Sequence, residues 1–205
     1  MLAIISALVL YLAVALAAPA PTLEERSSRP IPMYIHPRSA PHMCLTAFRQ
    51  GQGQYLGARM YIHNCTGAEN QQFRTAYGDT VLEFRGTSAQ GNKEKYCVVT
   101  DAVQPDNPTV DRTNGKPAIL YHCPPHKDAK PTGDTSRPVN GVWVQYDHGT
   151  IKLKSTSESN PSEANPDVCL DLKDGNTAQG TPVQQWQCYR GNQNQQWLVN
   201  NKITA

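Results

Sequence analysis

The stretch Val168–Val199, VCLDLKDGNTAQGTPVQQWQCYRGNQNQQWLV, decides the fold that this sequence predicts. It opens with Cys169-Leu170-Asp171, turns at Asp174-Gly175 and closes with Asn194-Gln195-Gln196-Trp197. Short runs of alternating apolar and polar residues are separated by Gly, Asn and Pro, a pattern typical of β-strands joined by tight turns. The stretch therefore predicts three short strands.

The side chains in this stretch also indicate the kind of ligand that it could bind. Asp171 supplies a carboxylate, Trp186 an indole, and several Asn and Gln residues supply amides. A carboxylate and amides can together accept hydrogen bonds from several hydroxyl groups and donate to them. An aromatic face can cover the C–H side of a sugar ring. We therefore predict a site for a polyhydroxylated ligand.

The same arrangement occurs twice earlier in the chain. Each unit has an opening Cys, an apolar strand that ends in a second Cys, and a closing Asn-x-x-aromatic motif. In the first unit these are Cys44-Leu45-Thr46, Arg59–Cys65 and Asn70–Phe73; in the second they are Cys97-Val98-Val99, Ala118–Cys123 and Asn140–Trp143. Internal repetition fixes the architecture, and it predicts three repeats at about residues 43–79, 80–149 and 150–205.

The six cysteines predict disulfides, since the chain is expected to be secreted. Their number alone leaves the pairing open. Pairing within each repeat gives Cys44–Cys65, Cys97–Cys123 and Cys169–Cys188, and each such loop restricts the unfolded chain by roughly 3 kcal/mol in the entropy model. A metal site is the rival interpretation, but the sequence has no Cys-x-x-Cys pair. No metal and no cofactor are expected.

The first 42 residues are expected to lie outside the folded domain. Leu2–Leu16 is apolar and uncharged, and Ala15-Leu16-Ala17 fits the small-x-small cleavage pattern of a signal peptide, so residues 1–17 predict secretion to the extracellular space. The run is too short for a good membrane-spanning helix, which needs about 20 apolar residues. Residues 18–42 are rich in Pro and are expected to be a flexible leader, with cleavage near Arg26 or Arg29 as the alternative.

The composition excludes some functions. The chain is 39% hydrophobic and 18% charged with a net charge of +2, and its basic residues are scattered. Without a basic stripe that includes aromatic residues, nucleic-acid binding has little support. No later segment is apolar enough to span a membrane. The sequence does not indicate an oligomeric state.

About twelve short strands and no amphipathic helix predict an all-β, closed or nearly closed fold over residues 43–205. The spacing between repeats is uneven because of two insertions, Ala102–Lys116 and Pro124–Val139. Both are rich in residues typical of turns, so surface loops are expected there.

A triple repeat with a Cys-Leu-Asp opening, a Gln-x-Trp-x-Cys middle and an Asn-Gln-x-Trp close resembles the ricin-B-type lectin domain, a β-trefoil with QxW repeats. The likeness covers roughly residues 43–205 and is densest in the third repeat. It implies a carbohydrate-binding protein whose closing aromatics Phe73, Trp143 and Trp197 are core residues, and whose partners are glycans.

The resemblance also implies a galactose or N-acetylgalactosamine type of site in the third repeat. Asp171 would accept hydrogen bonds from two ring hydroxyls, and charge makes these bonds stronger than neutral ones. Trp186 would lie under the apolar sugar face, and Gln184 is the middle Gln of the motif. Asn194 would bond a hydroxyl, while Gln195 would steady Asp171.

The first repeat keeps less of this set. His63 stands at the stacking position, and Asn70 and Gln71 are present, which leaves a weak second site possible. Thr46 replaces the carboxylate, however, and Tyr61 replaces the Gln.

The second repeat is expected to be scaffold. Val99 stands at the acid position, Ile119 at the Gln and Gly141 at the second amide, so that only Tyr121 and Asn140 remain.

Two other functions are alternatives to a lectin. A glycosidase needs two carboxylates at a defined separation, and Asp101, Asp106 and Asp111 lie in a Pro-rich insertion without an organising pattern, so no enzyme is expected. A protease inhibitor or protein-interaction module that uses the long loops of the second repeat is the stronger alternative.

Asn64-Cys65-Thr66 matches the N-glycosylation pattern, and the sequence leaves open whether Asn64 is glycosylated.

Overall fold

The structure is a computed structural model, and it describes residues 32–49, 55–75, 78–87, 91–100, 113–123, 143–145, 149–153 and 167–203. All of them belong to one unit, Ile31–Ala205. The predicted signal peptide, and most of the two insertions, lie outside the described residues. Within the described ranges, no helix has the length and apolar character needed to cross a membrane.

The described chain is built from strands, as predicted. In chain order they are β1 (Tyr34–Pro37), β2 (Met43–Ala47), β3 (Met60–Asn64), β4 (Phe73–Arg74), β5 (Gly78–Thr80), β6 (Glu83–Thr87), β7 (Lys93–Thr100), β8 (Ala118–His122), β9 (Trp143–Gln145), β10 (Ile151–Leu153), β11 (Val168–Leu172), β12 (Val183–Gln187) and β13 (Trp197–Asn200). Short 3₁₀ turns lie between some of them: η1 (Glu69–Gln71), η3 (Lys173–Gly175) and η4 (Gln193–Gln195).

One group of strands forms a ring through its pairings and bridges. β13 pairs with β1, β4 pairs with β6, and β9 pairs with both β5 and β10. Two isolated bridges, Met33 with Phe73 and Thr150 with Gln196, join these groups, and β5 continues along the chain into β6 through residues 81–82, which completes the circuit. Because the ring returns to its start, its strands leave no long unpaired edge. The closed all-β fold expected from the sequence is confirmed.

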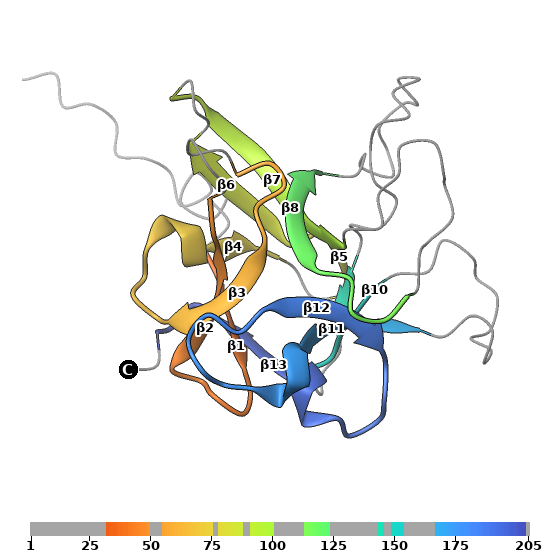
Figure 1. Ribbon diagram of the computed structural model, residues 1–205. Helices are drawn as coiled ribbons and strands as arrows, with labels where there is room; N and C mark the ends of the chain where they lie inside the picture. Colours follow the sequence, from red (N-terminus) through yellow and green to blue (C-terminus); the bar gives the residue numbers. More distant parts are fainter. Residues whose placement is uncertain are drawn as a thin grey trace, which may run out of the picture. The chain divides into compact units, whose positions relative to one another are not determined.

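The remaining long strands form three antiparallel hairpins, one in each repeat: β2–β3, β7–β8 and β11–β12 (Figure 1). A disulfide joins the two strands of each hairpin region, with the pairing predicted from the repeats: Cys44–Cys65, Cys97–Cys123 and Cys169–Cys188. Single bridges also link each hairpin to the other two: Arg59 with Ile119, Tyr61 with Pro182, and Pro117 with Gln184. Three equivalent hairpins on a strand ring are the β-trefoil arrangement.

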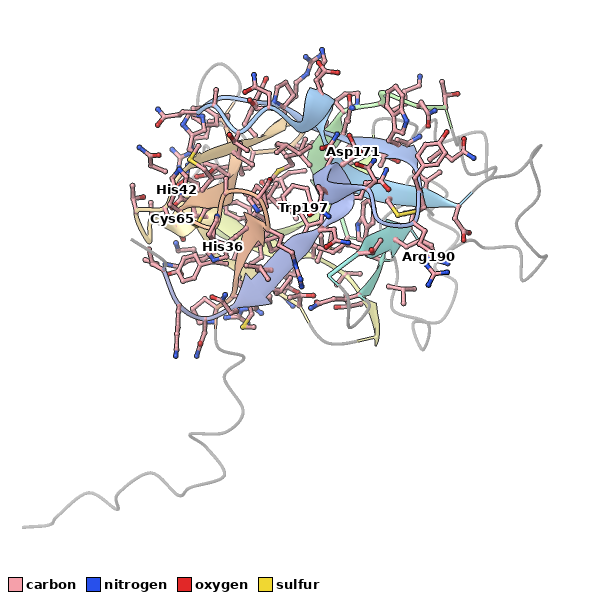
Figure 2. The ribbon with its side chains drawn as sticks, turned by 90° about the horizontal axis from the view of Figure 1, so that it is seen from below. His36, His42, Cys65, Asp171, Arg190 and Trp197 are labelled. Atoms are coloured by element: carbon pink, nitrogen blue, oxygen red, sulfur yellow. A yellow bond between two sulfur atoms is a disulfide. The ribbon has the colours of Figure 1, made fainter. Side chains whose placement is uncertain are left out.

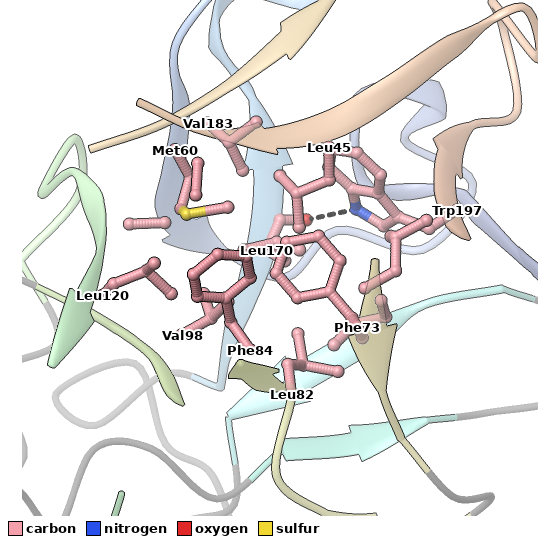
Figure 3. Close-up of a cluster of buried hydrophobic side chains, with 14 of the residues drawn as sticks. Leu45, Met60, Phe73, Leu82, Phe84, Val98, Leu120, Leu170, Val183 and Trp197 are labelled. Carbon is pink, nitrogen blue, oxygen red and sulfur yellow. Dashed lines mark hydrogen bonds between the residues drawn. The ribbon is translucent and has the colours of Figure 1, made fainter. Parts of the chain in front are cut away.

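The closing aromatic of each repeat lies in the core, where Figure 3 shows apolar side chains from all three repeats meeting. Phe73, Trp143 and Trp197 are at most 1% exposed. The Trp143 indole N–H donates to the Val98 carbonyl (2.8 Å), and the Trp197 indole N–H donates to the carbonyl of Leu170 (2.9 Å). Val98 and Leu170 follow the first Cys of their repeats, so the two bonds are repeat equivalents.

The domain boundary predicted at residue 43 is wrong by about ten residues. β1 lies in the expected flexible leader, yet its four residues are buried and pair with β13 along their whole length. Ile35 is 0% exposed and belongs to the core cluster. Pro32 precedes this strand and Pro37 is its last residue, so neither interrupts its interior, and proline is compatible with β pairing at the edge of a sheet. Composition alone could not separate this short buried strand from the Pro-rich segment before it.

We predict that Trp197→Phe destabilises the protein. A phenyl ring fills the equivalent place in the first repeat, so the ring fits, but the Leu170 carbonyl loses its indole donor. A buried polar group left unpaired costs about 1–3 kcal/mol. Trp143→Phe is the matched variant and should lower the free energy of unfolding, measured with urea, by a similar amount. Unchanged stability in both variants would show that these bonds do not matter to the fold.

Candidate functional site

The pairing of β11 with β12 places three predicted site residues on one face of the third hairpin. Asp171 stands opposite Gln184, and Cys169 stands opposite Trp186. Since side chains alternate along a strand, Asp171, Gln184 and Trp186 point to the same side. Trp186 is half-buried, so part of its indole remains accessible, whereas Gln184 is 6% exposed.

Asp171, labelled in Figure 2, is the centre of a small polar network. Its side chain is 3% exposed. The Gln184 amide donates to Oδ1 and the Gln195 amide donates to Oδ2, both at 3.1 Å. A carboxylate oxygen can accept more than one hydrogen bond, so both oxygens keep capacity for a ligand hydroxyl. The network thus aims a preorganised acceptor along the face that carries Trp186.

The surroundings of Asp171 change its acidity. Burial raises the pKa of the carboxyl group above its ordinary value, because a buried carboxylate loses hydration. The hydrogen bonds from Gln184 and Gln195 act in the opposite direction, and the negative charge of Asp174 adds to the rise. The pKa of Asp171 is therefore raised on balance.

Gln195 holds Asp171 in place through buried hydrogen bonds. It is 1% exposed, and its Oε1 accepts from the backbone N–H of Tyr189 at 2.9 Å. Its Nε2 donates to Asp171 and to the Gln187 carbonyl at 2.8 Å. Both amide protons are thus used within the protein. Gln195 positions Asp171, which leaves it no donor for a ligand.

The position of the Asn194 side chain depends on the turn at Asp174-Gly175, which packs against it. Asp174 and Gly175 both have positive φ, 56° and 63°, which favours Gly, Asn and Asp. A Cβ atom at Gly175 would lie 2.4 Å from Asn194 Oδ1, so only glycine allows this packing. The Asn194 side chain is half-buried and makes no hydrogen bond to the described part of the chain. Its amide remains available beside the turn.

A segment that the sequence did not connect with this site lies beside Trp186. The Gln185 N–H donates to the Lys116 carbonyl (2.8 Å), and the Gly115 N–H donates to the Gln185 carbonyl (2.9 Å). Asn114 accepts from the Gln187 N–H at 2.6 Å. A Cβ atom at Gly115 would lie 3.7 Å from the Trp186 ring. The end of the second repeat's insertion therefore flanks the indole.

The described end of the predicted surface loop Ala102–Lys116 is exposed at residues 113–115, as expected, but the sequence did not indicate that it contacts the third repeat. Residues 113–116 bond to β12, and Gln185, which donates to the Thr113 carbonyl at 2.7 Å, is fully buried between the two repeats. Turn-forming composition describes a local preference, and it carries no information on which distant strand a segment contacts.

The first repeat contains the same support without the carboxylate. Gln71 is 2% exposed; its Oε1 accepts from the Thr66 N–H, and its Nε2 donates to the Asn64 carbonyl and to Thr46 Oγ1. Thr46 Oγ1 in turn donates to the Cys44 carbonyl at 2.8 Å. Asn70, proposed for a weak second site, donates to the Ala47 carbonyl at 3.2 Å. Gln71 and Thr46 therefore satisfy each other and offer no acceptor charge to a sugar.

In the second repeat, apolar residues fill the corresponding positions. Val99 is 0% and Ile119 is 8% exposed. The Tyr121 ring lies 5.2 Å from the ring of His122, centroid to centroid. Asn140 and Gly141 lie outside the described residues.

The sequence matches the family described as the ricin-type beta-trefoil lectin domain over residues 32–197. This match includes β1 and covers most of the chain, so the protein belongs to the ricin-type β-trefoil lectin domain family. Family membership supports a carbohydrate-binding role. A sequence search among curated proteins found no match.

Solved structures share the fold. The Rhizoctonia solani agglutinin is 16% identical with a TM-score of 0.52, and the match covers 89% of this chain and 100% of the agglutinin. The Macrolepiota procera ricin B-like lectin, solved in complex with lactose, is 15% identical with a TM-score of 0.50 over 85% of this chain and 98% of the lectin. ThreeFoil, a designed threefold symmetric protein, is 19% identical with a TM-score of 0.50 over 82% and 97%. At these identities the likeness concerns the fold alone.

We predict that Gln195→Met raises the pKa of Asp171 further, because it removes a hydrogen bond that lowers it. Carboxyl titration by NMR measures this shift directly. Gln71→Met is the matched control: it breaks the equivalent bonds in the first repeat and should destabilise the protein comparably, by about 1–3 kcal/mol per group left unpaired, without moving the Asp171 titration. The positioning role of Gln195 would be contradicted by an Asp171 pKa that is the same in both variants.

Proposed function

We propose that this protein is a secreted lectin without enzymatic activity that binds galactose- or N-acetylgalactosamine-type sugars at the third repeat. The observation that carries the proposal is the Asp171 carboxylate, which two amides hold on the same hairpin face as a half-exposed indole. The lactose complex of the Macrolepiota procera lectin supports this ligand class. Secretion is supported by the signal pattern in residues 1–17.

Each group has a separate task in the proposed complex. Asp171 accepts from neighbouring ring hydroxyls, and these charge-assisted bonds are the strongest in the site. Trp186 covers the apolar face of the sugar, and the free amide of Asn194 bonds a further hydroxyl. A single shallow site of this kind gives a dissociation constant on the order of millimolar, about −4 kcal/mol. Useful avidity then requires several copies of the glycan or of the protein.

The alternative of a protease inhibitor or interaction module depends on the insertions of the second repeat, of which residues 102–112 and 124–139 lie outside the described residues. A deletion that separates the two functions has to end at residue 112, because Thr113–Lys116 are bonded to β12. Such a deletion should leave sugar binding intact if the lectin proposal holds.

We predict that Asp171→Asn and Trp186→Ala each abolish retention on a galactose resin. The first change removes the charged acceptor, and the second removes the stacking face. Tyr121→Ala is the matched control, since Tyr121 occupies the position of Trp186 in the second repeat, and it should be retained like the unaltered protein. Circular dichroism melting confirms that each variant is folded. Folded variants that still bind the resin would place the site elsewhere.

We further predict that retention falls on acidification with a midpoint above pH 3.8, the ordinary pKa of Asp. Burial raises the pKa of Asp171, so its carboxylate is protonated, and the charged acceptor lost, at a higher pH than usual. Asp174→Asn removes a neighbouring negative charge, keeps a residue that tolerates positive φ, and should move the midpoint to lower pH. A midpoint that does not move would show that Asp171 does not control binding.

A further inference from the structure

A second hollow lies on the first repeat, outside the site proposed for neutral sugars. Its volume is about 260 Å³. The residues that line it come from β3 and the residue before it, from the segment after β2 and from the loop before β12: Phe48, Arg49, Arg59, Tyr61, His63 and Gly180. We call it the first-repeat hollow. Of the three residues predicted for a weak second site, only His63 lines it, because Asn70 and Gln71 bond to the protein itself.

The charge of this hollow is opposite to that of the third-repeat site. Thr46 stands where Asp171 stands in the third repeat, and its hydroxyl is already committed to Cys44 and Gln71. Two exposed guanidinium groups, of Arg49 and Arg59, line the hollow instead. Among the described residues, neither forms an ion pair with a carboxylate. Both charges therefore remain available to an anion.

The hollow also has an apolar wall. Phe48 is 41% exposed, so part of its ring is open to a ligand. Its ring lies 4.4 Å from the His63 ring and 5.6 Å from Tyr61, in an edge-on contact. Burial lowers the pKa of His63, so its imidazole is neutral at pH 7 and can exchange hydrogen bonds with hydroxyls.

Arg49 is oriented by an aromatic contact. Its Cζ atom lies 4.7 Å from the centroid of the Tyr55 ring, which is buried in the core cluster. A cation over an aromatic face is stabilised by about 0.5–1 kcal/mol at exposed sites, and the contact restricts the long side chain. An arginine held in this way loses less conformational entropy when it binds a ligand.

We propose that the first-repeat hollow binds an anionic saccharide, with its sulfate or carboxylate group on Arg49 and Arg59 and a sugar face against Phe48. The planar guanidinium fork matches both kinds of oxyanion. The exposed ring suits the C–H face of a pyranose, while Tyr61 and His63 suit its hydroxyls. A single hollow with two cations favours one charged residue of a glycan over a nucleic acid, which requires an extended basic track. The site is independent of Asp171 and adds a second ligand class.

The test is calorimetric titration of the mature protein with galactose 6-sulfate, galacturonic acid, galactose and sodium sulfate at low salt. Both charged sugars are expected to bind at least tenfold more tightly than galactose at this site. Arg49→Gln/Arg59→Gln should remove that gain, and both side chains are exposed, so folding should survive. Phe48→Ala should weaken the charged sugars without changing the response to sodium sulfate. Binding of only one charged sugar would identify which oxyanion the hollow accepts.

Two controls keep this result separate from the third-repeat site. Arg38→Gln/Arg190→Gln removes the same charge from exposed side chains that do not line the hollow, and it should bind as the unaltered protein does. Asp171→Asn should lose galactose and keep the charged sugars, so the two sites can fail separately. The proposal is overturned if charged sugars bind no better than galactose, if the arginine pair can be replaced without loss, or if inorganic sulfate binds as tightly as the sulfated sugar.

Discussion

A buried glutamine amide holds the candidate site of the third repeat together, and the same interaction occurs in the first. Gln195 and Gln71 each accept from a backbone N–H just beyond the hairpin and donate to the carbonyl that precedes the second Cys. Their second amide proton goes to the residue two positions after the first Cys, Asp171 or Thr46. One side chain thus ties the start of a hairpin to its end and fixes the group between them.

This common support explains how one fold can present different chemistries. Where the supported residue is Asp171, the amide donors stabilise a buried carboxylate that can accept from hydroxyls. Where it is Thr46, the hydroxyl is satisfied within the protein, and the charge that the described residues contribute to the hollow comes from the nearby arginines. In the second repeat the corresponding sequence position is Gly141, which has no side chain, and buried Val99 replaces the acid. The three repeats share the same strand pairing and differ in the side chains at the equivalent positions.

Much of the fold could be predicted because the same sequence pattern occurs three times in the chain. The recurring cysteine spacing predicted the three disulfides, and the resemblance to the lectin family placed the closing aromatics in the core. β1 was missed because its partner, β13, lies at the other end of the chain, and short-range composition does not report such pairing. The same limit applies to residues 113–116 beside Trp186. The first-repeat hollow was missed because Phe48 and Arg49 belong to no repeated motif, and because Arg59 corresponds to Pro117 and Pro182 in the other two repeats.

Trp186 gives the most direct measurement of the central claim. The chain has three tryptophans, and two of them, Trp143 and Trp197, are buried with their indole N–H groups bonded to backbone carbonyls. In a ¹H–¹⁵N NMR titration of the mature protein with N-acetylgalactosamine, the account predicts that the indole resonance of Trp186 shifts in a saturable manner while the other two stay in place. A titration that leaves Trp186 unmoved, or shifts all three resonances alike, would contradict it.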